Sequence, residues 1–291
     1  MKKQLISMVL MAAMTVSMLT GCKTAGGKKA EAPSSGNQAA AEAKTEDEEK
    51  ASEGGEDYSY HWKLATTESS DYYMTQLSQE FLDIVEEKTG GKVTGEVFAS
   101  GQLGGLVDAL EGLEMGNIDI VMDGVSSLSA VDDIFNVWCL PFLYDNKEHQ
   151  YRFWDNHFDE VSDMVAEQSG FRLVSVIDGM NRELASTVPV ESMADLKGLK
   201  IRVPNIPGYV RIWECLGAAP IPMSLSEVYT SIQTGVVQGQ ENDIALTLSL
   251  KFYEVAPYCV MTDHVAYEGS FSTIAKSPSF RYMKAILLRA S

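Results

Sequence analysis

Short apolar runs alternate with helical patterns through the first half of the chain after residue 58. The apolar runs are bounded by glycine or polar residues, as is typical of strands. We expect strands at 60–66, 92–99 and 117–123 and helices at 72–88 and 106–116. In the first helix an apolar stripe should face the core, formed by Leu77, Phe81, Ile84 and Val85. This alternation predicts an α/β fold with a parallel sheet.

The second half continues the same pattern. Further strands are expected at 171–178, 183–187, 200–203, 218–221 and 236–238, and further helices at 147–168, 208–216 and 224–234. The segment WCLPFLYDN, 138–146, should form a buried strand and turn. The aromatic residues of the 147–168 helix are expected in the core. Ser224 and Glu227 have the spacing of a helix capping box, so Glu227 has a structural role and is no candidate catalytic acid.

The segment LKIRV, 199–203, alternates apolar and basic residues. Lys200 and Arg202 should therefore leave one face of a strand while the apolar side chains fill the other. Taken alone, the pattern is typical of a solvated edge strand. The alternative is a pair of cations directed at a ligand.

Three polar positions follow predicted strands. In open α/β sheets, ligands bind beyond the carboxyl ends of the strands. Thr67 follows the first strand, and Asp123 and Ser126 follow the third, so all three are candidates for a ligand cleft. For Asp123, turn formation with Gly124 is an equally good explanation.

The N-terminal 22 residues have the features of a secretory signal: two lysines, an apolar run and the sequence Leu-Thr-Gly before Cys22. This ending resembles a bacterial lipobox, in which Cys22 is acylated; an ordinary cleaved signal is the alternative. Residues 23–57 are rich in Ala, Gly, Ser, Lys and Glu and contain no aromatic residue, so we expect a disordered tether. Its root-mean-square span would be roughly 30–35 Å.

Composition limits the possible partners. The 291 residues carry a formal net charge of −18, with 45% hydrophobic and 22% charged residues. Such a chain forms globular α/β structure but repels the phosphates of nucleic acid. An anionic ligand would therefore need a local positive site, which directs attention to inward-facing arginines.

Metal and enzyme signatures are missing from the sequence. The histidines, at 61, 149, 157 and 264, have no metal-ligand spacing, so no metal site or cofactor is expected. The four cysteines, at 22, 139, 215 and 259, form no C-x-x-C motif. At most one disulfide is possible, and we expect the last three cysteines to be small buried side chains. The turn SGQLGG lacks a nucleotide-binding pattern, and no G-x-S-x-G elbow occurs.

Two long motifs carry a resemblance to a known family. They are DLKGLKIRVPN, 195–205, and LGAAPIPMSLSEVYTSIQTGVVQGQEN, 216–242. Together with GKVTGEVFASGQLGG, MGNIDIVMDG, LPFLYDN and KFYEVAPY, they resemble the solute-binding subunits of TRAP transporters, the tripartite ATP-independent periplasmic carriers. The resemblance covers nearly everything after residue 58.

The resemblance implies a ligand site. The arginine of the G-x-K-x-R element, Arg202 here, would clamp a substrate carboxylate. Arg182 would line the same pocket, as would Asn242 in the Q-E-N element. Asn205, at the end of the first motif, is a further candidate for this pocket.

The resemblance also implies an architecture: two α/β domains joined by a hinge, with a ligand cleft between them, as in periplasmic binding proteins. Domain I would comprise 58–179 plus 268–291 and domain II 180–267, with Gly179 at the hinge.

The implied function is capture of a small organic acid, a C4-dicarboxylate or a sugar acid, for delivery to TRAP-type integral membrane subunits. The protein would be extracytoplasmic, lipid-anchored to the outer face of the cell membrane or in the periplasm, and would not be an enzyme. The alternatives are a secreted hydrolase or lyase that acts on an acidic sugar, and a binding protein that serves as a sensor.

Two positions depart from the family pattern. An aromatic residue often precedes S-E-V-Y in the family, whereas this chain has Leu225. After TIAKSPSF the chain ends in RYMKAILLRAS, where the family continues through long helices that brace both domains. We therefore expect the C-terminal helices to be truncated.

Overall fold

The computed structural model describes residues 59–275. Several predictions fall outside these residues: the signal peptide 1–22, lipidation of Cys22, the tether 23–57 and the C-terminal helices. They remain predictions.

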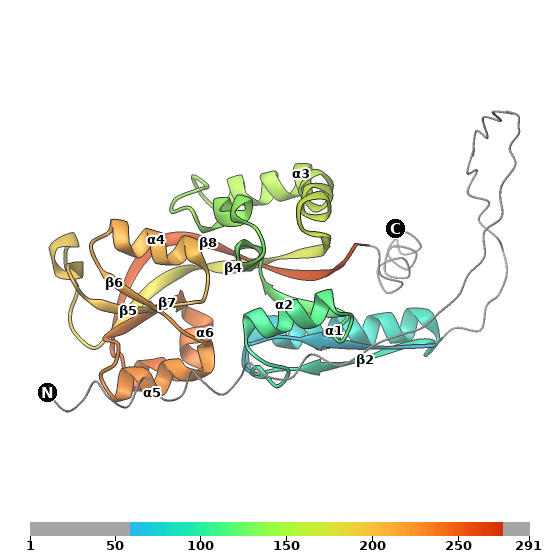
Figure 1. Ribbon diagram of the computed structural model, residues 1–291, viewed down its shortest axis with the longest axis horizontal. Coiled ribbons are helices and arrows are strands. Elements are labelled where there is room, and N and C mark those ends of the chain that lie inside the picture. Colours follow the sequence, from blue (N-terminus) through green and yellow to red (C-terminus); the bar gives the residue numbers. More distant parts are fainter. Residues whose placement is uncertain (1–58, 276–291) are drawn as a thin grey trace, which may run out of the picture. The chain divides into compact units, whose positions relative to one another are not determined.

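Eight strands form one sheet (Figure 1). The strands are β1 (Tyr60–Ala65), β2 (Val93–Phe98), β3 (Ile120–Gly124), β4 (Phe171–Ser186), β5 (Lys200–Val203), β6 (Ala219–Pro222), β7 (Gly239–Asp243) and β8 (Tyr258–Ile274). Their order in the sheet is β2-β1-β3-β8-β4-β7-β5-β6.

The sheet is mixed rather than parallel. β1 is parallel to β2 and β3, and β5 is parallel to β6 and β7, as predicted. In the middle of the order, β4 and β8 are antiparallel to each other, and they also pair in antiparallel fashion with β7 and β3. These two long strands occupy the places where the chain was predicted to cross between domains. The domain boundaries themselves stay a prediction.

Six α-helices occur among the described residues, together with short 3₁₀ turns. The helices are α1 (Tyr73–Thr89), α2 (Leu106–Glu114), α3 (Lys147–Ser169), α4 (Pro207–Cys215), α5 (Val228–Gln233) and α6 (Ile244–Ser249). The 3₁₀ turns are η1 (Val125–Ala130), η2 (Asp133–Cys139), η3 (Met193–Leu196), η4 (Leu225–Glu227) and η5 (Phe252–Glu254).

The predicted core stripe of α1 is confirmed at Val85, half-buried at Phe81, and wrong at Leu77 and Ile84. Leu77 and Ile84 are 39% and 44% exposed, and the buried face consists of Met74, Thr75, Ser78, Leu82 and Val85. Leu82 packs closely over Gly95 of β2, where an added Cβ would lie 2.8 Å from it. The buried face therefore includes the polar Thr75 and Ser78 beside Met74, Leu82 and Val85, which a pattern based on apolar residues alone does not detect.

Three other element predictions need correction. The predicted helix 224–234 is divided into η4 and α5, although Glu227 does accept a hydrogen bond from the Ser224 amide at 3.0 Å. The strand predicted at 236–238 lies instead at Gly239–Asp243, because the chain reaches the edge of β5 only there. The segment 138–146 forms no strand, and Phe142 is 72% exposed.

The core lies on both sides of the sheet in four clusters of buried apolar side chains. The prediction for the 147–168 helix is confirmed at Trp154, which is buried and stacks on Trp138 with ring centroids 6.1 Å apart. Burial of such side chains supplies roughly 1.5–3 kcal/mol each, which makes these clusters the main support of the sheet.

Gly179 lies at an irregularity in the β4–β8 pairing. A Cβ at this position would lie within 2.3 Å of the Tyr267 carbonyl oxygen in β8. Close approach of two backbones therefore explains the glycine, while its role as a hinge remains a prediction.

Candidate functional site

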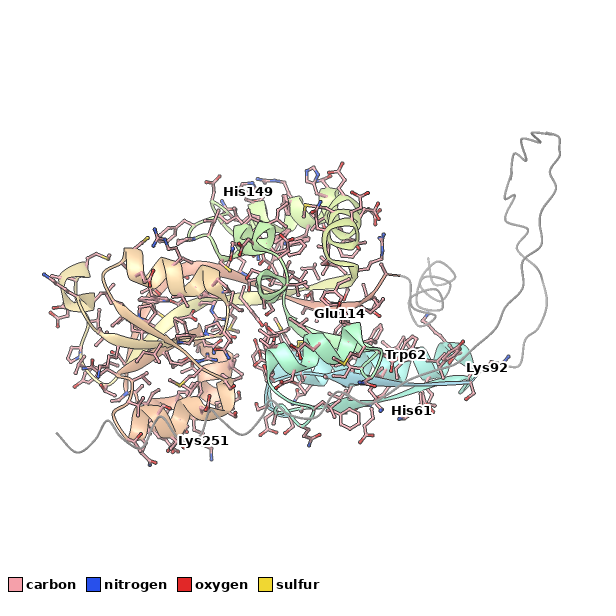
Figure 2. The ribbon with its side chains drawn as sticks, in the orientation of Figure 1. His61, Trp62, Lys92, Glu114, His149 and Lys251 are labelled. Atoms are coloured by element: carbon pink, nitrogen blue, oxygen red, sulfur yellow. The ribbon has the colours of Figure 1, made fainter. Side chains whose placement is uncertain are left out.

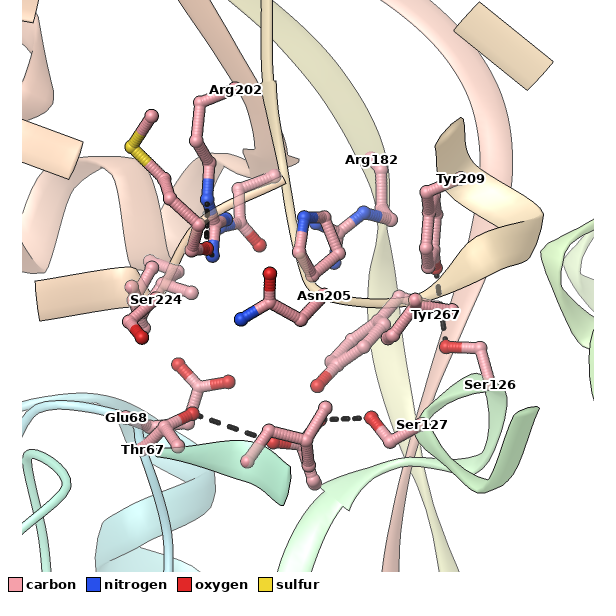
Figure 3. A pocket seen from close by; sticks show the side chains of 18 residues that line it. Thr67, Glu68, Ser126, Ser127, Arg182, Arg202, Asn205, Tyr209, Ser224 and Tyr267 are labelled. Carbon is pink, nitrogen blue, oxygen red and sulfur yellow. Dashed lines mark hydrogen bonds between the residues drawn. The ribbon is translucent and has the colours of Figure 1, made fainter. Parts of the chain in front are cut away.

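The strand ends and connecting segments enclose a polar pocket with an empty volume of about 530 Å³, open solvent included (Figure 3). All seven substrate-binding residues predicted from the sequence line this pocket: Thr67, Asp123, Ser126, Arg182, Arg202, Asn205 and Asn242. Thr67 and Ser126 follow the carboxyl ends of β1 and β3, and Asp123 is the last residue but one of β3. The others come from β4, β5, the turn after β5, and β7.

Arg202 lies in β5, between the parallel strands β6 and β7, and is only 3% exposed. A solvated edge strand is therefore excluded for this residue, whereas Lys200 is exposed. The Arg202 Nε and Nη2 atoms donate to the Met223 carbonyl oxygen at 3.1 and 2.8 Å. Burial lowers the pKa of Arg202 to about 10, so the guanidinium is charged at neutral pH.

The hydrogen bonds to Met223 orient one edge of the guanidinium. Among the described residues, the Met223 carbonyl oxygen is the only hydrogen-bond acceptor of this side chain, and the terminal N–H groups at Nη1 remain available. A guanidinium edge presents two parallel donors that match a carboxylate. The geometry therefore suits an anion that enters the pocket.

Arg182 has a different environment. Its Nε and Nη2 atoms donate to the two carboxylate oxygens of Glu241 at 2.6 and 2.9 Å. Its guanidinium also lies 4.9 Å from the ring centroid of Tyr209 and 5.3 Å from that of Tyr267. Burial opposes the charged form, but the neighbouring Glu241 outweighs it and raises the pKa of Arg182. This charge is already paired within the protein.

Glu241 is held as a carboxylate. Although burial opposes its ionisation, Arg182 and then His264 lower its pKa below the ordinary value. His264 Nε2 lies 3.3 Å from Glu241 Oε2, and the other ring nitrogen lies 2.8 Å from Thr262 Oγ1. Glu241 thus ties β7 to β4 and β8.

The two asparagines differ in exposure. Asn242 is buried in β7, and Asn205 is exposed after β5. Figure 3 shows the Asn205 amide directed into the middle of the pocket. Both side chains are placed to offer a donor and an acceptor to a bound molecule.

The Asp123 side chain accepts hydrogen bonds from its own segment and also lines the pocket. One carboxylate oxygen accepts from the Gly124 amide at 2.7 Å and from Ser127 Oγ at 2.5 Å, and the other lies 3.4 Å from Thr67 Oγ1. Asp123 and Gly124 are the last two residues of β3, so the Asp123 side chain bonds to its own segment but forms no turn with Gly124. Ser126 Oγ lies 3.2 Å from the Tyr209 hydroxyl. These contacts fix the lower rim of the pocket in Figure 3.

The sequence analysis missed Glu68, Tyr209 and Tyr267, which also line the pocket. Glu68 is 4% exposed, and its Oε2 atom has no hydrogen-bond partner among the described residues. Burial, and then Asp123 and Asp243, raise its pKa well above the usual range. Its place beside Thr67 was the one available signal, since the same strand-end argument applies to both residues. No sequence pattern indicated the tyrosines.

Leu225 lines the pocket where the related family often has an aromatic side chain. The wall of the pocket is therefore aliphatic at this place.

A larger apolar hollow lies beside α4, with an empty volume of about 1,620 Å³. Its only basic lining residue is Arg211, which is exposed and lies 3.5 Å from Glu214. This hollow therefore lacks the buried cation that an anion site requires.

Metal and redox chemistry find no support within residues 59–275. No cluster of potential metal ligands occurs there, and Figure 2 shows His61 on β1 and His149 on α3 in separate places. The three cysteines in this range are free. Cys139 is buried as expected, but Cys215 and Cys259 are exposed, so the prediction of three buried cysteines is wrong for these two.

Residues 64–276 match the family model DctP, described as bacterial extracellular solute-binding protein, family 7. A solute-binding protein of Roseobacter denitrificans is 37% identical over 190 residues, which is 65% of this chain and 58% of the relative. The 2,3-diketo-L-gulonate-binding periplasmic protein of Escherichia coli is 31% identical over 69% of this chain and 61% of its own length. The chain thus spans about three fifths of the length of these curated relatives.

Solved structures share the fold. A TRAP periplasmic solute-binding protein from Roseobacter denitrificans with bound L-galactonate aligns with a TM-score of 0.73 and 30% identity, covering 80% of this chain and 79% of that one. A second, from Sulfitobacter sp. with bound β-D-galacturonate, has a TM-score of 0.73 and 28% identity, with 79% of each chain covered. The predicted α/β fold of a periplasmic binding protein is confirmed.

Proposed function

The chain belongs to family 7 of the bacterial extracellular solute-binding proteins, and on this premise we propose that it captures a small organic acid, a C4-dicarboxylate or a sugar acid, through Arg202. The observation that carries the proposal is a buried guanidinium whose terminal donors face a polar pocket. Two solved structures of similar proteins contain bound sugar acids.

The proposed binding mode follows from the environment of each arginine. Arg202, oriented by the Met223 carbonyl, presents its free edge to the carboxylate of the ligand. Arg182 is bound to Glu241 and acts by holding the wall of the pocket in place. Asn205 and Asn242 then hydrogen-bond the remaining polar groups of the ligand.

Capture is proposed to bring domains I and II together about the β4–β8 connection, with delivery to TRAP-type integral membrane subunits. We place the protein outside the cytoplasm and propose that Cys22 carries the lipid anchor. Among residues 59–275, no helix has the length and apolar character needed to cross a bilayer.

A thermal-shift screen of the chain from residue 23 onward tests the proposed function. The panel consists of C4-dicarboxylates, aldonates, uronates and 2-oxo acids. An acid at a hundredfold excess over its dissociation constant should stabilise the protein by about 2.7 kcal/mol. The ligand recovered after denaturation should be chemically unchanged, since a hydrolase or lyase would release product. A chain that no acid stabilises would contradict the proposal.

A further inference from the structure

A second polar pocket lies between the start of α3 and the central strands β4 and β8. It has an empty volume of about 700 Å³, open solvent included. One wall comes from the segment 142–150, where Figure 2 labels His149, and the other from Asn181 in β4 with Asp263 and Ala266 in β8. None of its lining residues belongs to the pocket that contains Arg202. The two pockets can therefore be tested separately.

Two side chains of this second pocket carry buried polar groups that the protein does not pair. Gln150 is 2% exposed, and neither its amide nitrogen nor its amide oxygen has a hydrogen-bond partner among residues 59–275. The Tyr144 hydroxyl is unpaired within the same range. Both side chains lie near Glu268, whose carboxyl group instead accepts a hydrogen bond from Trp154 Nε1 at 3.3 Å.

Unpaired buried polar groups favour a hydroxylated ligand. Leaving such a group without a partner costs free energy, and a ligand that supplies the partner recovers that cost. A hydroxyl group fits Gln150 in either direction, because it can accept from the amide nitrogen and donate to the amide oxygen. A second hydroxyl can pair in the same way with the Tyr144 hydroxyl.

The lysine of this pocket is already engaged, whereas one aspartate is not neutralised. Lys147 Nζ lies 3.0 Å from Asp178 Oδ1 and also donates to the Gly179 carbonyl oxygen. Asp263 accepts a hydrogen bond from Asn181 Nδ2 at 2.8 Å. Within residues 59–275, no basic side chain forms an ion pair with Asp263. The charge of Asp263 is therefore available to a ligand.

Two further carboxyl groups add negative charge around Asp263. Glu183 Oε2 accepts from the Asp263 amide at 2.9 Å, and burial, with the Asp263 charge as a further cause, raises the pKa of Glu183. Asp145, on the α3 side of the pocket, is exposed and lies 3.5 Å from His149 Nδ1. An ammonium group would be attracted to this rim, and an anion would be repelled from it.

We propose that this pocket is a second binding site, for a small hydroxylated ammonium compound of the amino sugar kind, with hydroxyl groups on Gln150 and Tyr144 and the ammonium group at Asp263. The ligand has the opposite charge to the acid proposed for the pocket of Arg202. Because the pockets share no lining residue, the second site does not depend on the proposed function.

The test compares three sugars by ligand-observed NMR titration of the wild-type chain at about pH 6.5, where the amine of D-glucosamine is protonated. D-Glucosamine should bind with a dissociation constant of about 1 mM or tighter. D-Glucose and N-acetyl-D-glucosamine keep the hydroxyls but lack the charge, so each should bind at least about 5-fold more weakly.

Gln150→Leu should weaken glucosamine binding at least about 10-fold and leave the melting temperature as high as in the wild type or higher. An unpaired buried amide contributes no internal hydrogen bond, so an apolar side chain of similar size should replace it without loss. Gln168→Leu is the matched control at an exposed position of the same helix, and it should leave the affinity unchanged.

Asp263→Asn should reduce the preference for glucosamine over glucose to less than about 2-fold, because the amide carries no charge. Asp159→Asn removes the same charge at an exposed position outside the pocket and should preserve the preference. Arg202→Ala should not alter glucosamine binding, since Arg202 lines only the other pocket.

Three results would overturn the inference. The first is a wild-type chain that does not bind glucosamine, or that binds glucose equally well. The second is a folded Gln150→Leu protein with unchanged glucosamine affinity; if it is also less stable, the amide has a structural role. The third is loss of glucosamine binding in Arg202→Ala, which would place the sugar in the other pocket.

Discussion

At the residue scale, two buried arginines of one pocket differ because of their neighbours. Arg182 lies against Glu241, which raises its pKa despite burial. Arg202 has only a backbone carbonyl as its hydrogen-bond acceptor, and burial lowers its pKa to about 10. The first arginine supports the pocket wall, and the second keeps its charge for a ligand.

Arg182→Ala should therefore affect stability more than affinity. Removing one partner of a buried ion pair leaves the other charge uncompensated, which costs about 3–5 kcal/mol. Urea unfolding should show a loss of this size in the free energy of unfolding. The double variant Arg182→Ala/Glu241→Gln should recover part of it, since no carboxylate is then left alone. A single variant as stable as the wild type would contradict the assignment.

Sequence reasoning located residues in this pocket unevenly. Arg182, Arg202 and Asn242 were found because they stand in recognisable motifs. Tyr267 could not be found this way, because the pairing of β8 with β3 and β4 brings it to the pocket across most of the chain. Glu68 needed knowledge of its burial, since an isolated acidic residue after a strand is usually solvated.

At the element scale, the alternation of strands and helices could be predicted, while pairing direction and exact position could not. The antiparallel pair β4 and β8 depends on contacts between segments far apart in sequence. The displacement of the predicted strand 236–238 to Gly239–Asp243 has a related cause. The polar run Gln240-Glu241-Asn242 resembles a turn, yet its side chains are buried. Gln240 donates a hydrogen bond to Thr247 of α6, and Glu241 accepts one from Arg182 of β4.

Glu268 in β8 gives this element a pH-dependent stability. It accepts a hydrogen bond from Trp154 Nε1 at 3.3 Å, and burial raises its pKa to about 7, with Gln150, Trp154, Tyr144 and Lys147 opposing the rise. The ordinary value is about 4.3. Because the folded state binds the proton more tightly, stability falls as the pH rises from about 4.3 through about 7 and then levels off.

Glu268→Gln should remove this loss. The amide keeps an oxygen for Trp154 and cannot ionise, so the variant should be more stable than the wild type at pH 8 by roughly 3 kcal/mol, and close to it at pH 5. Urea unfolding at the two pH values measures the difference. Equal pH dependence in variant and wild type would show that Glu268 does not carry the effect.

At the scale of the whole molecule, the proposed capture of an organic acid must work against the negative charge of the chain, and Arg202 is buried at 3% exposure. The formal net charge is −18. The net charge of the chain therefore does not attract an anion over long distances, and the proposed binding depends on the short-range contact with Arg202. Closure around the ligand would strengthen that contact by excluding water.

Ligand binding should reduce the radius of gyration if the predicted domains close on each other. Small-angle scattering of the chain from residue 23, with and without a stabilising acid from the screen, measures this change. Identical curves at saturation would rule out hinge closure but leave binding intact.

The lipid anchor is tested separately in cells. Cys22→Ser should release the protein from the membrane fraction, because one thiol is the proposed site of acylation. Ser17→Ala, within the same predicted signal, is the control and should leave the distribution unchanged. A normally processed Cys22→Ser protein that still sediments with membranes would refute the anchor.

Calorimetric titration of the best-bound acid against wild type, Arg202→Lys and Arg202→Ala tests the carboxylate clamp most directly. Loss of one partner of a desolvated pair costs about 2–5 kcal/mol, so Arg202→Ala should weaken binding roughly 30- to 5,000-fold. Lysine should be a poor substitute, since an ammonium cannot offer two parallel donors. Circular dichroism establishes that each variant is folded. Near-wild-type affinity in folded Arg202→Ala would mean that the carboxylate is held by another residue.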